Sequence, residues 1–327
     1  MDLVEFGPDD AAHADAFLEL TIATDAVDTP WELPRTRHRQ EMYMRHSWEG
    51  EPGRWFVAYD GQVPVGTAVI DVSDYDNLEM AWFTMRVGPA YRRRGHGTAM
   101  LKALERIADE MGRPLLGMDG PDTDATSAFA AAMGYELKSV EVRRIQVVAD
   151  SPDPRPIRDE ALAHAADYDL VRVEGYSSDD LLAELVDLTA AINDAPFDDL
   201  EWEDEVYSPE RVRAYEQAQI ESGYRFRRIL ARHRPTGELA GHTVLVVDPE
   251  NPHVADQHDT SVVRAHRGHR LGLLLKAEML LWLADAEPQV THVHTNNAES
   301  NRHMIAVNER LGYHPVARIL QFQRRLR

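Results

Sequence analysis

The sequence contains no cysteine in its 327 residues. Disulfide bridges are therefore excluded, and so are the thiolate ligands of common zinc sites. A covalent intermediate on a thiol is excluded as well. Histidine does not replace cysteine as a ligand, because the pairs His292/His294 and His266/His269 have no third ligand at a recognisable spacing. We therefore expect no metal site.

Long apolar runs are also missing. No stretch approaches the roughly 18 consecutive apolar residues that read as a membrane span. The acidic start MDLVEFGPDD has no basic segment followed by an apolar run, as a signal peptide would have. We therefore predict a cytoplasmic protein without a membrane partner.

Positive charge is scarce. The sequence has 35 basic and 56 acidic residues, a formal net charge of -21, and its only lysines are Lys102, Lys138 and Lys276. Such a charge disfavours binding to nucleic acid and attracts cations, although an acidic surface also serves solubility alone. We therefore expect no nucleic-acid partner.

The chain contains an internal repeat. In each half an apolar strand-like run leads into an arginine- and glycine-rich turn and then into a helical pattern. The two copies read AWFTMRVGPAYRRRGHGTAMLKALERIADEMG and DQHDTSVVRAHRGHRLGLLLKAEMLLWLADAEP. A constant offset of 175 residues aligns Arg92 with Arg267 and Gly97 with Gly272. This offset indicates a duplication.

The segments that flank the repeat are duplicated too. Asp60-Gly61 and Thr236-Gly237 each lie between β-prone runs, as the turn of a hairpin does. Each half then ends in a strand, a helix, a Gly-Tyr pair and a β-prone segment. The proline-rich segment ADSPDPRPIRDE between the halves is typical of an exposed linker. We therefore predict two domains, residues 1–154 and 155–327.

The turn has the composition of a phosphate-binding loop. Arg92, Gly95 and Gly97 fit the pattern Arg-x-x-Gly-x-Gly directly ahead of a helix. The first N–H groups of a helix lack intrahelical partners and, with the helix dipole, attract an anion. Glycine lets the backbone approach a diphosphate closely, and arginine adds charge-assisted hydrogen bonds. A helix N-terminus that holds no ligand is the alternative.

This stretch resembles the coenzyme A pyrophosphate loop of the GNAT superfamily of N-acetyltransferases. The resemblance covers most of both halves, as in tandem members such as mycothiol synthase. It implies an α/β (α+β) fold of two GNAT domains, each a mixed, mostly antiparallel sheet flanked by helices. It also implies a V-shaped splay between the fourth and fifth strands that holds pantetheine, and acetyl-CoA as the acyl donor.

The resemblance assigns cofactor-binding residues to both turns. The second turn departs from the pattern, since Arg270 stands where the first has Gly95. Arg270 either adds a phosphate contact or stiffens the loop, and we favour binding. The expected contacts are Val87, Arg92, Arg93, Arg94, Gly95, His96, Gly97 and Thr98 in the first half, and Val262, Val263, Arg267, Gly268, His269, Arg270, Leu271 and Gly272 in the second.

The second landmark of the family is a helix that begins with an asparagine, which hydrogen-bonds pantetheine, and carries a tyrosine, which protonates the departing thiolate. The second half supplies Asn301 at the first position and Asn308 at the tyrosine position, whereas the first half has Thr123 and Ala130. Asn308 cannot act as an acid, but its amide can hydrogen-bond a thiolate. We add Asn296 as a cofactor contact. Helix capping or surface exposure is the alternative for all three asparagines.

Transfer to an amine also needs a proton acceptor. In many members of the family, an acidic residue on the fourth strand takes this role, directly or through water. The run DQHDTSVV offers Asp256, His258 and Asp259, and strand alternation places Asp259 on the face opposite the other two. The run AWFTMRV of the first half has no ionisable side chain before Arg86. We name Asp259 and Asn308 as catalytic, with a solvated or capping Asp259 as the alternative.

We therefore predict an acetyl-CoA-dependent N-acetyltransferase of the GNAT type, an acyltransferase without a covalent intermediate. The second domain is expected to be catalytic and the first degenerate or structural. The acceptor is expected to be an amine on a small molecule, and the acidic field suits a cationic one. A monomer and a homodimer both fit. The alternatives are a non-catalytic acyl-CoA-binding or sensing protein, favoured by the missing tyrosines, and a lysine or N-terminal protein acetyltransferase.

Overall fold

The chain folds into two compact units, and neither is a continuous stretch of sequence. The structure, a computed structural model, describes residues 1–326. Unit 1 contains Met1–Glu141, Phe197–Glu203 and the chain from Ala317 onward, and unit 2 contains Val142–Pro196 and Asp204–Val316. Each unit contains part of a 12-stranded sheet and has a hydrophobic core of its own.

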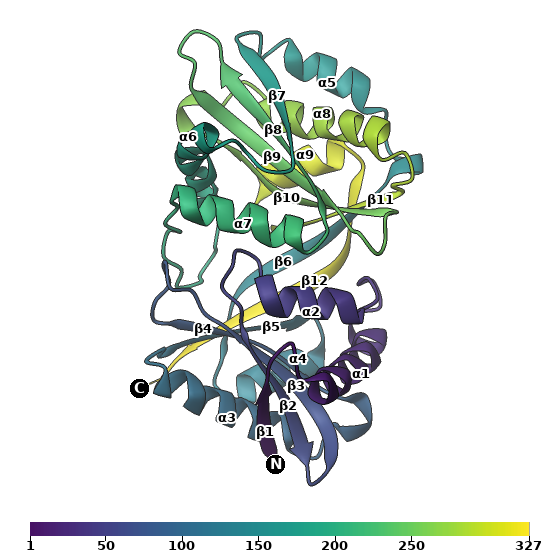
Figure 1. Cartoon of the computed structure of the whole chain (residues 1–327), viewed down its shortest axis with the longest axis vertical. Helices are drawn as coiled ribbons and strands as arrows, with labels where there is room; N and C mark the ends of the chain where they lie inside the picture. The colour runs from purple at the N-terminus through teal and green to yellow at the C-terminus, as the bar shows by residue number, and fades with distance from the viewer. Residues whose placement is uncertain (327) are drawn as a thin grey trace. The chain divides into compact units, whose positions relative to one another are not determined.

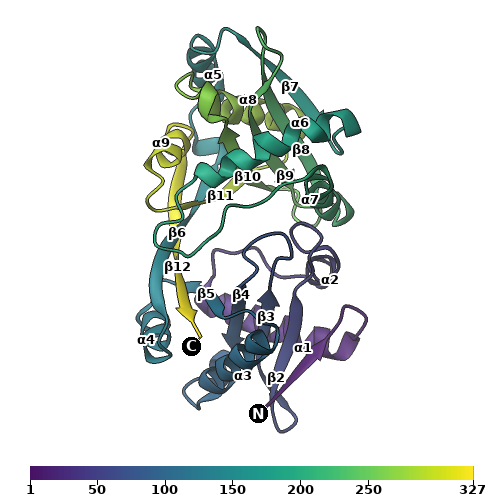
Figure 2. The same ribbon diagram turned by 90° about the vertical axis from the view of Figure 1, so that its left-hand side faces the viewer.

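Unit 1 is built on a sheet with the strand order β1-β2-β3-β4-β5-β12 (Figure 1). Helices α1 and α2 pack on one face of this sheet, around Trp55 and Val69. Helices α3 and α4 pack on the other face, around Phe56 and Phe83, and Figure 2 shows α3 lying along the sheet. The elements from the first half are β1 (Asp2–Phe6), α1 (Ala11–Asp28), α2 (Arg37–His46), β2 (Arg54–Asp60), β3 (Val63–Asp71), β4 (Met80–Val87), η1 (Pro89–Tyr91), α3 (His96–Glu110), β5 (Leu115–Pro121) and α4 (Asp124–Ala132).

Unit 2 repeats this architecture with the strand order β7-β8-β9-β10-β11-β6. Helices α5 and α8 cover one face of its sheet, and α6 and α7 cover the other (Figure 1). Its elements are η2 (Val148–Asp150), α5 (Pro154–Leu162), β7 (Tyr168–Glu174), α6 (Asp179–Ala190), η3 (Ala191–Asp194), α7 (Pro209–Glu221), β8 (Arg225–His233), β9 (Leu239–Val247), β10 (Val254–Val262), η4 (Arg264–His266), α8 (Leu271–Ala286), β11 (His292–Ala298) and α9 (Arg302–Arg310).

The fourth and fifth strands of each unit form a short parallel pair and then part. In unit 1, residues 80–83 of β4 pair with residues 115–118 of β5, and the rest of β4 pairs only with β3. In unit 2, residues 254–256 of β10 pair with residues 292–294 of β11. The neighbouring strand pairs are antiparallel. The predicted mixed, mostly antiparallel sheets and their splay are therefore confirmed.

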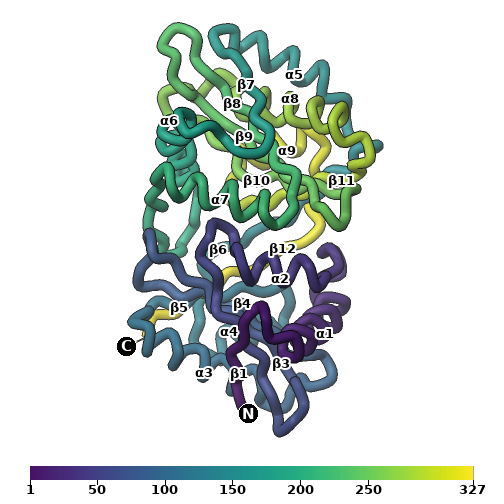
Figure 3. The backbone as a smooth tube through the Cα atoms, viewed as in Figure 1, coloured from purple at the N-terminus to yellow at the C-terminus, as the bar shows by residue number. Residues whose placement is uncertain are grey.

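The two halves of the chain exchange their last strands. Strand β12 (Tyr313–Arg325) follows α9 in sequence, yet its residues 319–325 pair with β5 in unit 1. Strand β6 (Glu136–Val147) follows α4 and hydrogen-bonds to β11 in unit 2. Figure 3 follows the C-terminal end of the chain, in yellow, to its place beside β5. A single cut near residue 155 therefore does not describe how the chain divides.

The proline-rich segment between the halves is partly helical. Helix α5 begins at Pro154, and the Asp153 side chain accepts a hydrogen bond from the Arg155 N–H. Proline suits the first turn of a helix because its missing N–H has no intrahelical partner there. The segment therefore starts a helix of unit 2 and is not only a linker.

Helix α8 carries a lysine in the core of unit 2. The Lys276 side chain is 2% exposed, and its Nζ lies 5.0 Å from the centre of the Tyr313 ring. Burial lowers the pKa of Lys276 to about 7. An unfolded lysine has a pKa of about 10.4, so between pH 7 and 10 the unfolded chain binds more protons than the folded one. The lysine therefore destabilises the fold most at and below neutral pH.

We predict that Lys276→Met raises the free energy of unfolding by about 2 kcal/mol or more at pH 7, because methionine fills a similar volume without a charge. The gain should shrink as the pH rises from 7 to 10. Urea unfolding at several pH values measures both effects. A gain that is constant over this range would contradict a buried, pKa-shifted lysine.

Candidate functional site

The two arginine turns, residues 92–98 in unit 1 and 267–273 in unit 2, have the same backbone conformation. Left-handed residues occur at the same two places, Arg93 (φ 63°) and Gly95 (φ 86°) in unit 1, and Gly268 (φ 88°) and Arg270 (φ 56°) in unit 2. Each turn thus has one glycine and one arginine at these places, in opposite order. The replacement of Gly95 by Arg270 therefore keeps the path of the turn, at a cost of about 1–2 kcal/mol for a left-handed L-residue.

The first arginine of each turn binds the protein itself. Arg92 Nε donates to the carbonyl of the residue five positions earlier at 3.1 Å, and its two terminal nitrogens donate to the Asp28 carboxylate at 2.9 and 2.5 Å. Arg267 repeats this arrangement, with Nε 3.1 Å from the equivalent carbonyl and Nη2 2.6 Å from Asp194. These two arginines fasten the turn to the protein, which differs from the phosphate contact that the sequence suggested.

The two remaining arginines of the unit 1 turn face solvent and are not paired. Arg93 and Arg94 are exposed, and within residues 1–326 neither side chain has a hydrogen bond or an ion pair. His96 lies 3.9 Å from Asp60, too far for a hydrogen bond. Two unpaired guanidinium groups therefore stand beside the start of α3.

The arginines around the unit 2 turn are all paired. Arg264 and Arg267 both bind Asp194, at 2.5 and 2.6 Å, and Arg270 binds Glu160. The hydrogen bond from Arg264, with the charge of Arg267, holds the pKa of Asp194 below its usual range. Positive charge that unit 1 leaves free is therefore neutralised in unit 2.

The N-terminus of α3 can accept an anion. The first hydrogen bond inside this helix joins the Ala99 N–H to the Gly95 carbonyl, so the N–H groups of His96, Gly97 and Thr98 have no intrahelical partner. No protein atom lies within 4 Å of where a Cβ of Gly95 would stand. The free amides, the open approach and the two unpaired arginines fit the diphosphate of coenzyme A.

The N-terminus of α8 differs from that of α3 in the side chains around it. No protein atom lies within 4 Å of where a Cβ of Gly272 would stand, but Leu271 is 2% exposed. His269 is exposed, and its ring centre lies 5.5 Å from that of Tyr168. This helix start therefore offers free amides without free arginines.

The valines ahead of the turns use their backbone groups within the protein. The carbonyls of Val87 and Val262 accept the hydrogen bonds from Arg92 and Arg267. The Val263 N–H donates to a strand β9 carbonyl at 2.9 Å, and its own carbonyl accepts from the η4 helix at 2.8 Å. The contacts of these valines with the cofactor stay a prediction.

The asparagines of the second half have structural partners. Asn301 caps α9, because its side chain accepts from the Met304 N–H at 3.1 Å. Asn308 is 0% exposed and donates to Asn297 at 2.6 Å. Its buried position differs from that of a group that stabilises a departing thiolate. The equivalent Ala130 in unit 1 is also 0% exposed.

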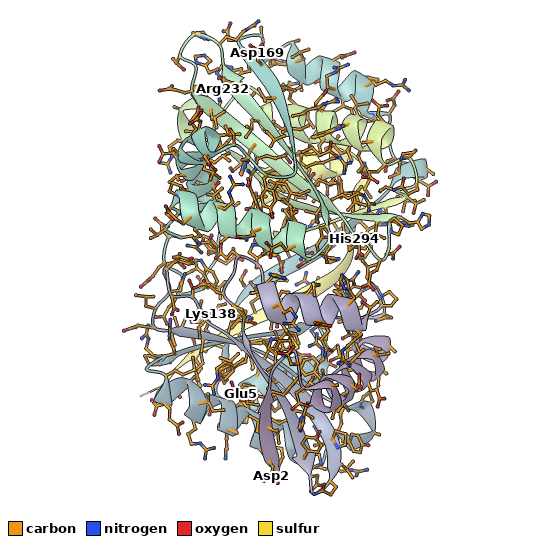
Figure 4. The ribbon with its side chains drawn as sticks, viewed as in Figure 1. Asp2, Glu5, Lys138, Asp169, Arg232 and His294 are labelled. Carbon is orange, nitrogen blue, oxygen red and sulfur yellow. The ribbon has the colours of Figure 1, made fainter. Side chains whose placement is uncertain are left out.

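Asn296 belongs to a polar group around Arg143 of β6. The Arg143 guanidinium lies 3.3 Å from Asn296 Oδ1, 2.9 Å from His294 Nδ1 and 3.6 Å from Asp256. His294 is labelled beside this part of the unit in Figure 4. The exchanged strand β6 thus positions residues at the splay of unit 2, which the sequence did not indicate.

The expected base Asp259 lies at a β-bulge. The register between β10 and β9 shifts between Gln257 and Thr260, so strict alternation does not hold there. Next to it, His258 Nδ1 lies 2.6 Å from the Tyr215 hydroxyl of α7, and burial lowers the pKa of His258 to about 3. His258 is therefore neutral at physiological pH.

Sequence reasoning missed a polar group on the α1–α2 face of unit 1. It comprises Asp71 at the end of β3, Arg86 on β4, Asp119 on β5 and Tyr43 on α2. These residues are far apart in the sequence and belong to no motif. Only the strand register, which the sequence does not give, brings them to one face.

Residues 1–326 lack two further features. No helix there is long and apolar enough to cross a membrane. No cluster of three histidine, cysteine, aspartate or glutamate side chains there could hold a metal ion.

We predict that Gly268→Ala lowers the free energy of unfolding by about 1–2 kcal/mol, because the left-handed backbone disfavours a Cβ although no atom lies within 4 Å. Gly272→Ala is the matched control. It lies in ordinary helical backbone with equally open space, and should leave stability unchanged or raise it by up to about 1 kcal/mol. Urea midpoints compare the two, and equal effects would contradict the backbone argument.

Comparison with known proteins agrees with the fold and the turn of unit 1. The model of the acetyltransferase (GNAT) family matches residues 21–135, which include that turn. None of the curated proteins matches the sequence. Among solved structures, the chain is similar to a tandem GNAT protein from the clavulanic acid biosynthesis pathway, with 28% identity, a TM-score of 0.79, and 99% of this chain and 98% of the other covered.

Two more distant structures share the fold. One is a GCN5-related N-acetyltransferase from Sphaerobacter thermophilus, with 17% identity, a TM-score of 0.68, and 100% of this chain and 96% of the other covered. The other is a fungal multi-domain β-N-acetylglucosaminidase with a GCN5-related glucosamine N-acetyltransferase region, with 16% identity, a TM-score of 0.69, and 98% and 38% covered. The family match over residues 21–135 therefore shows a GNAT acetyltransferase domain in the first half, and the whole chain has a tandem GNAT fold.

Proposed function

We propose that this acyltransferase moves an acetyl group from acetyl-CoA to an amine of a small molecule, with the donor bound at the turn of unit 1. The observation that carries this proposal is the pair of unpaired arginines, Arg93 and Arg94, beside the free N–H groups of α3. Charge-assisted bonds from arginine and a helix N-terminus together suit a diphosphate. The bound donor supplies an activated thioester, and the chain binds it, orients it and removes a proton from the amine.

Direct attack of the amine is the route that this sequence supports. The chain has no cysteine, so no thiol can carry the acetyl group between donor and acceptor. The family tyrosine is also missing, and Ala130 and Asn308 are buried in its two positions. The departing thiolate therefore takes its proton from solvent in this proposal.

The turn of unit 2 is the weaker candidate for the donor site. Asp194 and Glu160 already hold its arginines, so an entering diphosphate would have to compete with two carboxylates. The sequence had favoured unit 2 on account of Asn301, Asn308 and Asp259. The first two now have structural partners, and Asp259 remains as a predicted base at the bulge.

We predict that Gly97→Asp weakens acetyl-CoA binding at least tenfold, because one added charge near a dianion costs about 1 kcal/mol per charge pair even in water. A carboxylate in the first turn of α3 is favourable for the helix itself, so the fold should be retained. A Cβ at this position meets the Phe129 ring edge at 3.3 Å and the Val87 side chain at 3.6 Å. Calorimetry measures the affinity, and release of free CoA with a panel of amines measures transfer.

The matched controls separate charge from shape and one unit from the other. Gly97→Asn has the same shape as Gly97→Asp without the charge and should weaken binding less. Gly272→Asp makes the same change in unit 2 and should leave most of the transfer. If Gly272→Asp abolishes transfer and Gly97→Asp does not, the donor site lies in unit 2.

In that case Asp259 becomes the base to test. Asp259→Asn should then lower turnover about a hundredfold, within the range of general acid–base catalysis, while acetyl-CoA affinity stays the same. Binding of acetyl-CoA without CoA release for any amine would instead favour a non-catalytic acyl-CoA-binding protein. CoA release only with a peptide amine would favour protein acetylation.

A further inference from the structure

The α1–α2 face of unit 1 carries the polar group that the sequence did not reveal. Asp71 lies opposite Trp82 in the β3–β4 register, and directly opposite residues of an antiparallel pair share a face. Trp82 lies over Gly117 of β5, since a Cβ there would stand 2.1 Å from its ring. Asp119, two residues further along β5, shares that face by strand alternation. Arg86 shares it too, four residues beyond Trp82.

This face also gathers the unpartnered polar atoms of the unit. Buried polar groups in proteins normally have hydrogen-bond partners, so a concentration of exceptions calls for a ligand or water. Thr67 is 1% exposed and Trp55 is 7% exposed, and each has a polar atom without a protein partner. The part of unit 1 within residues 1–326 has seven such atoms. Six of them belong to α1, to the loop after it, or to this face of the sheet, and the seventh belongs to the segment that touches Trp82. Within residues 1–326, the unpartnered buried atoms of unit 1 are Thr21 Oγ1, Thr29 Oγ1, Trp31 Nε1, Trp55 Nε1, Thr67 Oγ1, Asp71 Oδ1 and Trp202 Nε1.

The two carboxylates differ in their exposure. Asp119 is exposed to solvent, and Asp71 is half-buried with its Oδ1 atom buried. Burial, together with the charge of Asp119, raises the pKa of Asp71 to about 6. Burial also raises the pKa of Asp119, against the effect of Arg86, and lowers the pKa of Arg86.

A segment from the second half of the chain forms an aromatic wall beside this group. We call Phe197–Glu203 the strap, and it belongs to unit 1. The Trp202 ring lies edge-on to Trp82 at 6.3 Å and stacks on Phe197 at 5.7 Å. Aromatic faces beside carboxylates suit an organic cation.

Paired hydrogen bonds fix the strap on both sides of Trp202. The Glu203 N–H donates to Asn77 Oδ1 at 2.9 Å, and the Asn77 N–H donates to Glu203 Oε2 at 2.8 Å. The Glu201 N–H donates to Gln323 Oε1 at 2.7 Å, and Gln323 Nε2 donates to the Glu201 carbonyl at 3.1 Å. Gln323 lies on the exchanged strand β12, so the second half of the chain both supplies and anchors Trp202.

We propose that this face of unit 1 binds the acceptor amine as a cation, held by Asp71 and Asp119 against Trp82 and the Trp202 that the strap supplies. Asp71 then takes the proton of the ammonium group, directly or through water. The freed amine nitrogen forms a bond to the acetyl carbon of the donor, the carbon–sulfur bond breaks, and the thiolate leaves with its electron pair. The nitrogen loses its second proton to solvent, and the thiolate takes a proton from solvent. This inference rests on the proposed function, which places the donor in the same unit.

Benzylamine, a cation at pH 7, and benzyl alcohol, its neutral analogue, are the binding probes. With CoA present, benzylamine should bind and benzyl alcohol should bind at least about tenfold more weakly, because only the cation meets the carboxylates and the indole faces. Asp119→Asn and Trp202→Ala should each weaken benzylamine binding several-fold. Asp109→Asn, an exposed carboxylate on α3 at the opposite face, is the charge-matched control and should change nothing.

Kinetics test the role of Asp71. Asp71→Asn should lower kcat/KM for amine acetylation about a hundredfold and leave acetyl-CoA affinity unchanged. The rise of kcat/KM with pH through about 6 should disappear in this variant, because a base must be deprotonated. Trp202→Ala should raise KM for the amine with little change in kcat. Trp202→Phe should raise KM less, because phenylalanine keeps an aromatic ring at this position. The titratable groups that interact with Asp71 are Asp119 and Tyr43. Arg86, Arg35 and Asp25 form the next group of charges around them.

The outcomes distinguish the two proposals. Equal binding of the two probes, or unchanged benzylamine binding in Asp119→Asn and Trp202→Ala, overturns the acceptor site while acetyl-CoA binding to unit 1 stands. A normal pH profile in Asp71→Asn removes it as the base. If acetyl-CoA binding is insensitive to Gly97→Asp, the proposed donor site fails first, and this site has no donor beside it.

Discussion

The early end of the parallel pairing between the fourth and fifth strands is the constraint on which the candidate sites depend. In unit 1 the last paired residues are Phe83 and Met118, and both strands continue beyond them. Strand β4 then leads into the turn that opens α3, while β5 carries Asp119 away from it. A fully paired sheet would satisfy these backbone groups within the ladder and would leave no opening at the carboxyl end of β4. The position of the turn, the N-terminus of α3 and the polar face therefore all follow from where this pairing stops.

The exchange of strands β6 and β12 gives each unit a strand from the other half of the chain. Each sheet would lack its sixth strand, and β5 or β11 would present an unpaired edge, if the halves were separated. The exchanged strands also carry site residues, since Gln323 of β12 anchors the strap and Arg143 of β6 contacts Asp256, His294 and Asn296. A duplication explains the repeat in the sequence, but the strand exchange explains why neither copy is complete on its own.

Local patterns in the sequence were sufficient for the fold and for the two turns. The hairpins at Gly61 and Gly237 depend on neighbouring residues and the 175-residue repeat on a constant offset, and the structure contains both hairpins and both copies of the repeat. Contacts between distant residues could not be read in this way. Asp28 and Asp194 as partners of the turn arginines, and the strap on Trp82, come from segments that no spacing rule connects. The register shift between Gln257 and Thr260 likewise depends on strand pairing, which the sequence does not give.

The two turns illustrate how equal backbones can differ in function through charge alone. Both have left-handed residues at the same two positions and open helix starts, so shape does not separate them. In unit 2, Glu160 and Asp194 neutralise the turn arginines from nearby elements of the same unit. In unit 1, Asp28 binds only Arg92, which fastens the turn, and leaves Arg93 and Arg94 to face solvent. An anion gains most where the positive charge has no internal partner, because no existing ion pair has to be broken before it binds. After duplication, the placement of a few carboxylates is therefore enough to direct an anionic donor to one of two otherwise similar turns.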